Sequence, residues 1–158
     1  MKTVTIMRGI PGSGKSKTAK DFIYSLKKET VEYCSADDFH VNKSGVYNFR
    51  PELAGNAHLY CMKTFLDAIE ASIDHIVVDN TNTQVWEYTP YVQVALASGY
   101  LVKIIEVTCD QQVAFERQTH GVPYEHHTRM HNRFQPVLPH HRSITKTIDN
   151  THYTVDHD

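Results

Sequence analysis

The sequence predicts an α/β fold of the kinase-like P-loop NTPase type, with a parallel sheet covered by helices on both faces and a short lid. Two observations carry this prediction. Short apolar runs alternate with helical patterns along the chain, and the first run leads directly into a glycine-rich phosphate-binding motif. The 158 residues match the length of one domain, so we expect a single domain over residues 1–158.

Apolar runs predict the strands of the sheet. Each run is short and bounded by glycine, proline or polar turn residues, which is typical of buried strands. Parallel sheets bind their ligands at the carboxyl ends of such strands. The expected strands are Val4–Met7, Val31–Cys34, Ile76–Asp79 and Leu101–Val107, and the alternating residues from Ile144 to Val155 predict a terminal strand or hairpin.

Apolar residues at steps of three or four predict a helix between successive strands. The polar, glycine-containing residues 41–50 predict a loop. The expected helices run from Lys15 to the basic Lys27 and Lys28, from Pro51 to Ile69, from Trp86 to Ala97, from Asp110 to Arg117 and from Tyr124 to Arg133. Aromatic residues on the apolar helix faces are expected in the core, namely Phe22, Phe65, Trp86 and Tyr91.

Composition excludes several classes of protein. The 41% apolar and 22% charged residues are ordinary for a globular domain and exclude a disordered or fibrous chain. The formal net charge of −2 neither demands nor excludes a nucleic-acid partner. The three cysteines lack CxxC spacing, so we expect free thiols. No apolar run is long enough for a signal peptide or a membrane span, so we expect a cytoplasmic protein without a membrane partner.

Residues 9–16 read GIPGSGKS and satisfy the phosphate-loop pattern G-x-x-x-x-G-K-[ST]. Glycines let successive backbone N–H groups converge on one anion, and the helix that follows offers its positive end to the same phosphates. We expect Lys15 to reach the β- and γ-phosphates of ATP and Ser16 to bind Mg²⁺. The expected ATP-binding residues are Gly12, Ser13, Gly14, Lys15, Ser16, Lys17 and Arg117.

Acidic residues end two of the expected strands. Asp79 is either a Walker B carboxylate that assists Mg²⁺ or part of a strand-end turn with Asn80. Asp37 and Asp38 follow the second strand, where a carboxylate can accept the proton of an attacking hydroxyl, although aspartate is also common in turns. We favour Asp37 as the base. The guanine-reading motif Asn-Lys-x-Asp is absent from the sequence, which argues against a GTPase.

Residues 118–134 predict a lid around Gly121 and Pro123. A lid arginine places positive charge on the transferring phosphoryl group only when the lid is closed. Arg117, Arg129 and Arg133 are the candidates, and a solvated helix face is the alternative for each. Tyr47 and Phe49 in the preceding loop either stack on a base or anchor the loop to the core.

The combined motifs resemble the polynucleotide-kinase-type P-loop kinases over roughly residues 3–135. The strings that carry the resemblance are GIPGSGKS, SADDFH, VVDNTNT and FERQTHGVP, with Gly45, Tyr47, Phe49, Pro51 and Leu53 between them. The resemblance implies that Asp37 is the general base for a 5′-hydroxyl and that Arg117 stabilises the transition state. His40 stands where the phage kinase domain has an arginine that grips the substrate's phosphate.

We therefore expect a kinase that uses ATP and Mg²⁺ to phosphorylate a hydroxyl group, with the 5′ end of DNA or RNA as the favoured acceptor. Two alternatives stay open: a kinase of small metabolites, nucleosides or nucleotides, and a nucleotide-binding regulator without catalysis. The sequence predicts no particular oligomeric state. The candidate substrate-binding residues are Asp37, Asp38, His40, Arg129 and Arg133.

Overall fold

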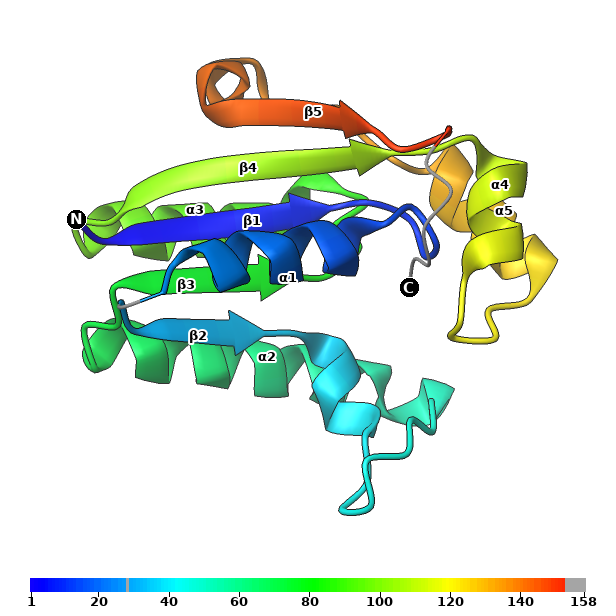
Figure 1. Ribbon diagram of the computed structural model, residues 1–158, viewed down its shortest axis with the longest axis horizontal. Coiled ribbons are helices and arrows are strands. Elements are labelled where there is room, and N and C mark those ends of the chain that lie inside the picture. The colour runs from blue at the N-terminus through cyan, green and yellow to red at the C-terminus, as the bar shows by residue number, and fades with distance from the viewer. Residues whose placement is uncertain (28, 153–158) are drawn as a thin grey trace.

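Five parallel strands form the central sheet of the computed structural model, which describes residues 1–27 and 29–152 (Figure 1). The sheet order is β2-β3-β1-β4-β5, and each neighbouring pair is parallel. The α/β P-loop fold is thus confirmed, and the end of the predicted terminal element lies outside the described residues. The strands are β1 (Thr3–Arg8), β2 (Val31–Cys34), β3 (His75–Asp79), β4 (Leu101–Thr108) and β5 (Thr145–Asp149).

Helices cover both faces of the sheet, as predicted. α1 (Lys15–Ser25) packs on one face, and α2 (Ala54–Glu70) and α3 (Val85–Ala97) pack on the other. Successive side chains of a strand point to opposite faces. In β1, Ile6 therefore joins the larger core cluster with residues of α2 and α3, whereas Met7 joins the smaller cluster with Ala19 of α1.

Except for the turn that directly precedes β5, the remaining elements lie beyond the carboxyl ends of the strands (Figure 1). Short 3-10 turns, η1 (Ala36–His40) and η2 (Pro51–Leu53), flank the loop that follows β2. α4 (Gln111–Arg117) and α5 (Tyr124–Asn132) follow β4, and η3 (Pro139–Ile144) leads into β5. Within the described part of the chain, no helix is both long enough and apolar enough to cross a membrane.

The prediction that Trp86 lies in the core is wrong. Its side chain is 71% exposed, and its indole N–H donates to the side chain of Gln84. The buried residues of α3 are Tyr88, Tyr91, Val92 and Ala95. Because each helical residue turns by about 100°, Trp86 lies about 200° from Tyr88 and faces away from the sheet. Phe65 and Tyr91 are buried as predicted, and Phe22 is partly buried.

Arg8 is fully buried at the end of β1 and joins three separate segments. Its guanidinium forms an ion pair with Glu106 of β4 and lies over the rings of Tyr88 and Phe134. It also donates to three backbone carbonyls, those of Asn82, Thr83 and Gln135. Arg8 therefore fixes the segment after β3 and the segment after α5 to the strand that leads into the phosphate loop.

Candidate active site

The phosphate loop connects β1 to α1. Gly12 and Gly14 have φ angles of +84° and +92°, in the left-handed region that favours glycine. A Cβ atom on Gly12 would lie 1.8 Å from the carbonyl oxygen of Ala114, so the backbone of α4 approaches the loop directly. Gly14 immediately precedes the first turn of α1. Such a turn at a helix N-terminus is the backbone geometry of an anion-binding nest.

Contacts from distant segments hold the outer side of the loop. The buried His127 of α5 donates from Nε2 to the carbonyl oxygen of Pro11 at 2.8 Å, while its Nδ1 accepts from Gln111. Asn150 donates to the carbonyl oxygen of Ser13 at 3.1 Å. Sequence reasoning missed these contacts, because no local pattern connects residues more than one hundred positions apart.

Lys15 and Asp79 form a buried ion pair at the base of the loop. The Lys15 Nζ lies 2.9 Å from Asp79 Oδ1, and the Tyr33 hydroxyl donates to the other carboxylate oxygen. Burial alone would raise the pKa of Asp79, but Lys15, Tyr33 and Ser16 outweigh it and hold the pKa below its usual value. Asp79 is therefore an ionised carboxylate beside the phosphate loop, as a Walker B residue would be.

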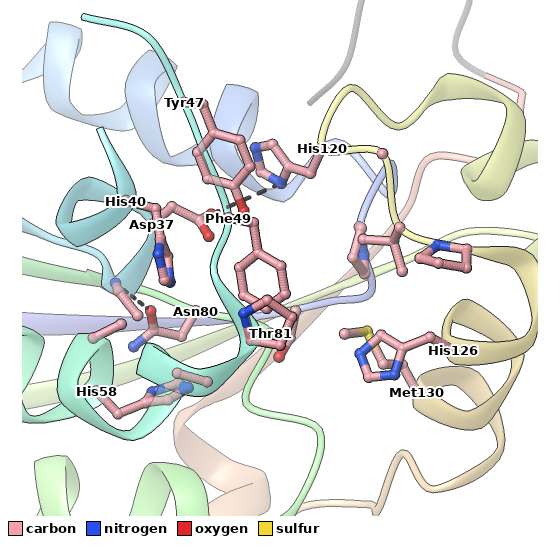
Figure 2. Close-up of a pocket in the computed structure, with 18 of the residues that line it drawn as sticks. Asp37, His40, Tyr47, Phe49, His58, Asn80, Thr81, His120, His126 and Met130 are labelled. Atoms are coloured by element: carbon pink, nitrogen blue, oxygen red, sulfur yellow. Dashed lines mark hydrogen bonds and ion pairs between the residues drawn. The ribbon is translucent and has the colours of Figure 1, made fainter. Parts of the chain in front are cut away.

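A cavity of about 590 Å³ opens beside the loop, within the usual range of small-ligand sites (Figure 2). Its walls come from η1 and the loop after it, from the start of α2, and from the segment 120–133. Lys15 and Asp37 both line this cavity. The structure therefore brings the lysine of the phosphate loop and the predicted base to one space.

Asp37 lies on η1 with its side chain 43% exposed. Its Oδ2 is 3.9 Å from Nδ1 of His120, and the Tyr47 ring stacks on the His120 ring with centroids 4.8 Å apart. We call this pair the Tyr47–His120 clasp. Burial and the nearby Asp37 raise the pKa of Tyr47 to about 12. The clasp joins the loop after β2 to the segment predicted to be a lid, and sequence reasoning did not identify His120.

Arg129 and Arg133 line the cavity on the wall formed by the segment 120–133. Arg129 donates to Nδ1 of His126 at 3.4 Å, and Arg133 donates to the hydroxyl of Thr83 at 3.2 Å. Burial and the two arginines lower the pKa of His126, so it is neutral at pH 7. This wall therefore carries two guanidinium groups beside a neutral imidazole.

His40 also lines the cavity and is only 5% exposed. Its ring packs edge-on against Phe49 at 4.9 Å. Among the residues that the structure describes, its Nδ1 has no hydrogen-bond partner. His40 is therefore a buried polar group at the cavity with unused hydrogen-bonding capacity.

Arg117, Lys17 and Asp38 are predicted site residues whose side chains do not line the cavity. Arg117 donates to the carbonyl oxygens of Asn150 and Thr151, at 2.8 and 3.1 Å. Lys17 is exposed on α1 and pairs with Asp21, and Asp38 is exposed on η1. Position in a motif places these residues near the phosphate loop but does not determine the direction of their side chains.

No group of three or more His, Cys, Asp or Glu side chains within residues 1–27 and 29–152 could hold a metal ion. Mg²⁺ does not require one, because it binds through one or two protein oxygens together with substrate phosphates and water. Ser16 and Asp79 are hydrogen-bonded to each other beside the phosphate loop. These two oxygen donors therefore fit the Mg²⁺ of a bound nucleotide.

Comparison with known proteins agrees with this geometry. Human NEDD4-binding protein 2 is 34% identical over 138 residues, which cover 84% of this chain, and the chain matches 8% of that protein's length. A Chloroflexus aurantiacus protein shares the fold with a TM-score of 0.72 and 16% identity, over 96% of this chain and 89% of that chain. A chain of the Pnkp1/Rnl/Hen1 RNA repair complex shares it with a TM-score of 0.64 and 17% identity, over 85% of this chain and 44% of that one.

The family model described as "AAA domain" matches residues 4–137, which is most of the sequence. That range contains the phosphate loop, strands β1 to β4 apart from Thr3, and the residues lining the cavity. The chain therefore belongs to this AAA domain family, as a P-loop kinase-like domain whose family implies the use of ATP and Mg²⁺.

Proposed function

We propose that the protein is an ATP-dependent kinase that transfers the γ-phosphoryl group to a hydroxyl, with the 5′-hydroxyl of DNA or RNA as the favoured acceptor. One observation carries the proposal: Lys15 of the phosphate loop and the carboxylate of Asp37 line the same cavity. A protein that only binds a nucleotide needs the first group but not the second. Phosphoryl transfer to a hydroxyl needs both.

The phosphate side of the reaction uses residues of the loop. The N–H groups around Gly12 and Gly14 and the ammonium of Lys15 bind the phosphates and balance the charge that spreads over the transferred group. Ser13 Oγ is buried without a hydrogen-bond partner among the described residues, so it is available to a phosphate oxygen. Ser16 and Asp79 would hold Mg²⁺, which supplies neutralisation of phosphate charge when it is bound.

The acceptor side uses the opposite wall. The half-exposed Asp37 takes the proton from the attacking hydroxyl. Arg129 and Arg133 offer two cations to the backbone phosphates of a nucleic acid, which is the contact that dominates affinity for such ligands. Arg117 stabilises the transferred group in this proposal only if it exchanges its bonds to Asn150 and Thr151 for bonds to phosphate.

Transfer of label from γ-labelled ATP tests the proposal, with 5′-hydroxyl RNA and DNA oligonucleotides beside nucleosides and sugars. We expect label on oligonucleotides and a fall in kcat of about 10²–10⁴-fold for Asp37→Asn, the usual contribution of a general base. For Asp38→Asn, kcat should fall less than about tenfold, because the Asp38 carboxylate lies outside the cavity. Asp67→Asn, on the exposed side of α2, is the matched control.

Three results would contradict the proposal in different ways. A wild-type rate in Asp37→Asn removes the base assignment. Label on nucleosides or sugars but not on oligonucleotides would show that the acceptor is a small molecule and not the 5′ end of a nucleic acid. A rise in Tm with ATP, without label on any acceptor, would favour a nucleotide-binding regulator that has no kinase activity.

A further inference from the structure

We infer that Phe49 and the facing wall of α5 form a slot for a nucleobase, so that the acceptor is recognised through the base of its terminal nucleotide. The inference rests on the proposed function for the class of acceptor. It adds a subsite that is separate from the hydroxyl-binding and phosphate-binding residues and that distinguishes nucleotides from sugars.

One side of the slot is the ring of Phe49, in the loop that follows η1. This ring lines the cavity and is still 46% exposed, although it is a large apolar group. Its backbone is held in place, because the N–H of Asn48 donates to the carbonyl of His40 and Val41 pairs with Tyr47. A fixed aromatic ring with an exposed surface inside a cavity is a preformed stacking platform.

The opposite side comes from α5 and the turn before it. Figure 2 shows His126 and Met130 across the cavity from Phe49, and Val122 and Pro123 line the same wall. The thioether of methionine makes favourable contacts with aromatic rings, and a neutral imidazole can stack on one. A planar heterocycle between Phe49 and this wall would meet apolar or flat groups on both faces.

The polar groups of the cavity define the orientation of the rest of the ligand. Asp37 marks the position of the reacting hydroxyl, and Arg129 and Arg133 mark that of a phosphate. The buried Nδ1 of His40, beside Phe49, offers one hydrogen bond to the ligand. A carboxylate, a flat apolar slot and two guanidinium groups match the hydroxyl, base and phosphate of a nucleotide, whereas a sugar phosphate leaves the slot without an occupant.

Two 5′-hydroxyl oligonucleotides that differ only in their first residue test the slot. One carries a nucleobase at that residue, and the other carries an abasic tetrahydrofuran. For each we would measure kcat/KM with labelled ATP, and Kd by fluorescence anisotropy without ATP, in the wild type, Phe49→Ala and Phe49→Trp. Tyr24→Ala is the matched control, because Tyr24 is 81% exposed on α1.

We expect the wild type to prefer the base-bearing end by about 5- to 100-fold, the range that loss of one base–aromatic stack produces. Phe49→Ala should lower kcat/KM and affinity for the base-bearing oligonucleotide by a similar factor, whereas both quantities should change by no more than about twofold for the abasic oligonucleotide. Phe49→Trp should retain the preference for the base-bearing end. Equal losses on both ends in Phe49→Ala, or no preference in the wild type, would overturn the slot but leave the kinase proposal intact. If the wild type neither binds nor phosphorylates either oligonucleotide, the proposed acceptor is wrong and the slot is wrong with it.

Discussion

The buried ion pair between Lys15 and Asp79 allows a quantitative test of how the phosphate loop is held. Lys15 is 4% exposed and Asp79 is 1% exposed, so water screens the 2.9 Å contact very little. Asp79→Asn keeps the shape of the side chain but supplies one acceptor oxygen where Lys15 and Tyr33 each donate to a carboxylate oxygen. Removing one partner of a buried pair costs about 3–5 kcal/mol. We expect a loss of that size at pH 7.

Urea unfolding of the wild type, Lys15→Met, Asp79→Asn and the double variant measures this loss as a cycle. The double variant should be more stable than the sum of the two single losses predicts, because it contains no buried charge from the pair. Asp67→Asn is the control: Asp67 forms a 2.8 Å pair with Lys63 on the surface of α2, and its removal should leave the unfolding midpoint unchanged.

The pH dependence has a definite sign. Because folding lowers the pKa of Asp79, its stabilisation is complete above the unfolded-state value of about 3.9 and is lost as the pH falls through the lower folded-state value. The difference in stability between wild type and Asp79→Asn should therefore be constant near neutral pH and shrink below about pH 4. A variant within about 1 kcal/mol of the wild type at pH 7, or strictly additive losses in the cycle, would refute the reasoning.

Two further pairs of substitutions test the supports of the loop. Arg8→Met should lower the free energy of unfolding by about 3–5 kcal/mol. Glu106→Gln should lower it by less, because Arg8 keeps its backbone acceptors. Equal losses of the two variants in urea unfolding would contradict this reasoning. Gly12→Ala forces a Cβ against the carbonyl of Ala114, so calorimetry should show loss of ATP binding. Gly45→Ala has a similar positive φ but open space around it, so it should cost only about 1–2 kcal/mol of backbone strain and keep ATP affinity.

Much of this fold was predictable because its signals are local. Short apolar runs define buried strands, and a glycine-rich sequence between a strand and a helix defines the phosphate loop. The placement of Lys15 and Asp37 on one cavity also follows from the sequence, since both lie just beyond the carboxyl ends of parallel strands, which meet at one edge. Trp86 was predicted incorrectly because an apolar residue beside an apolar helix face need not lie on it.

The contacts that complete the site could not be predicted in the same way. His127 reaches Pro11, and Tyr47 reaches His120, across long separations in sequence. Such pairs form only when the segment 118–134, the phosphate loop and the loop after β2 meet at the same edge of the sheet. The direction of the Arg117 side chain is likewise set by carbonyl groups that β5 and the residues after it bring close, and nothing around position 117 encodes them.

The two halves of the site are held by different forces, and this difference bears on where acceptor specificity resides. The phosphate half is buried, and its charges and carbonyls are paired with residues of the core, so a change at Gly12 or Asp79 alters folding and phosphate binding together. The proposed acceptor half combines half-exposed side chains, such as Asp37 and Phe49, with the buried His40, and ring contacts such as the Tyr47–His120 clasp and the packing of Phe49 on His40 hold it. Substitutions there change contacts with the ligand at small cost to the core. If the proposed kinase activity holds, we therefore expect residues 37–58 and 120–133, rather than the phosphate loop, to determine which hydroxyl is phosphorylated.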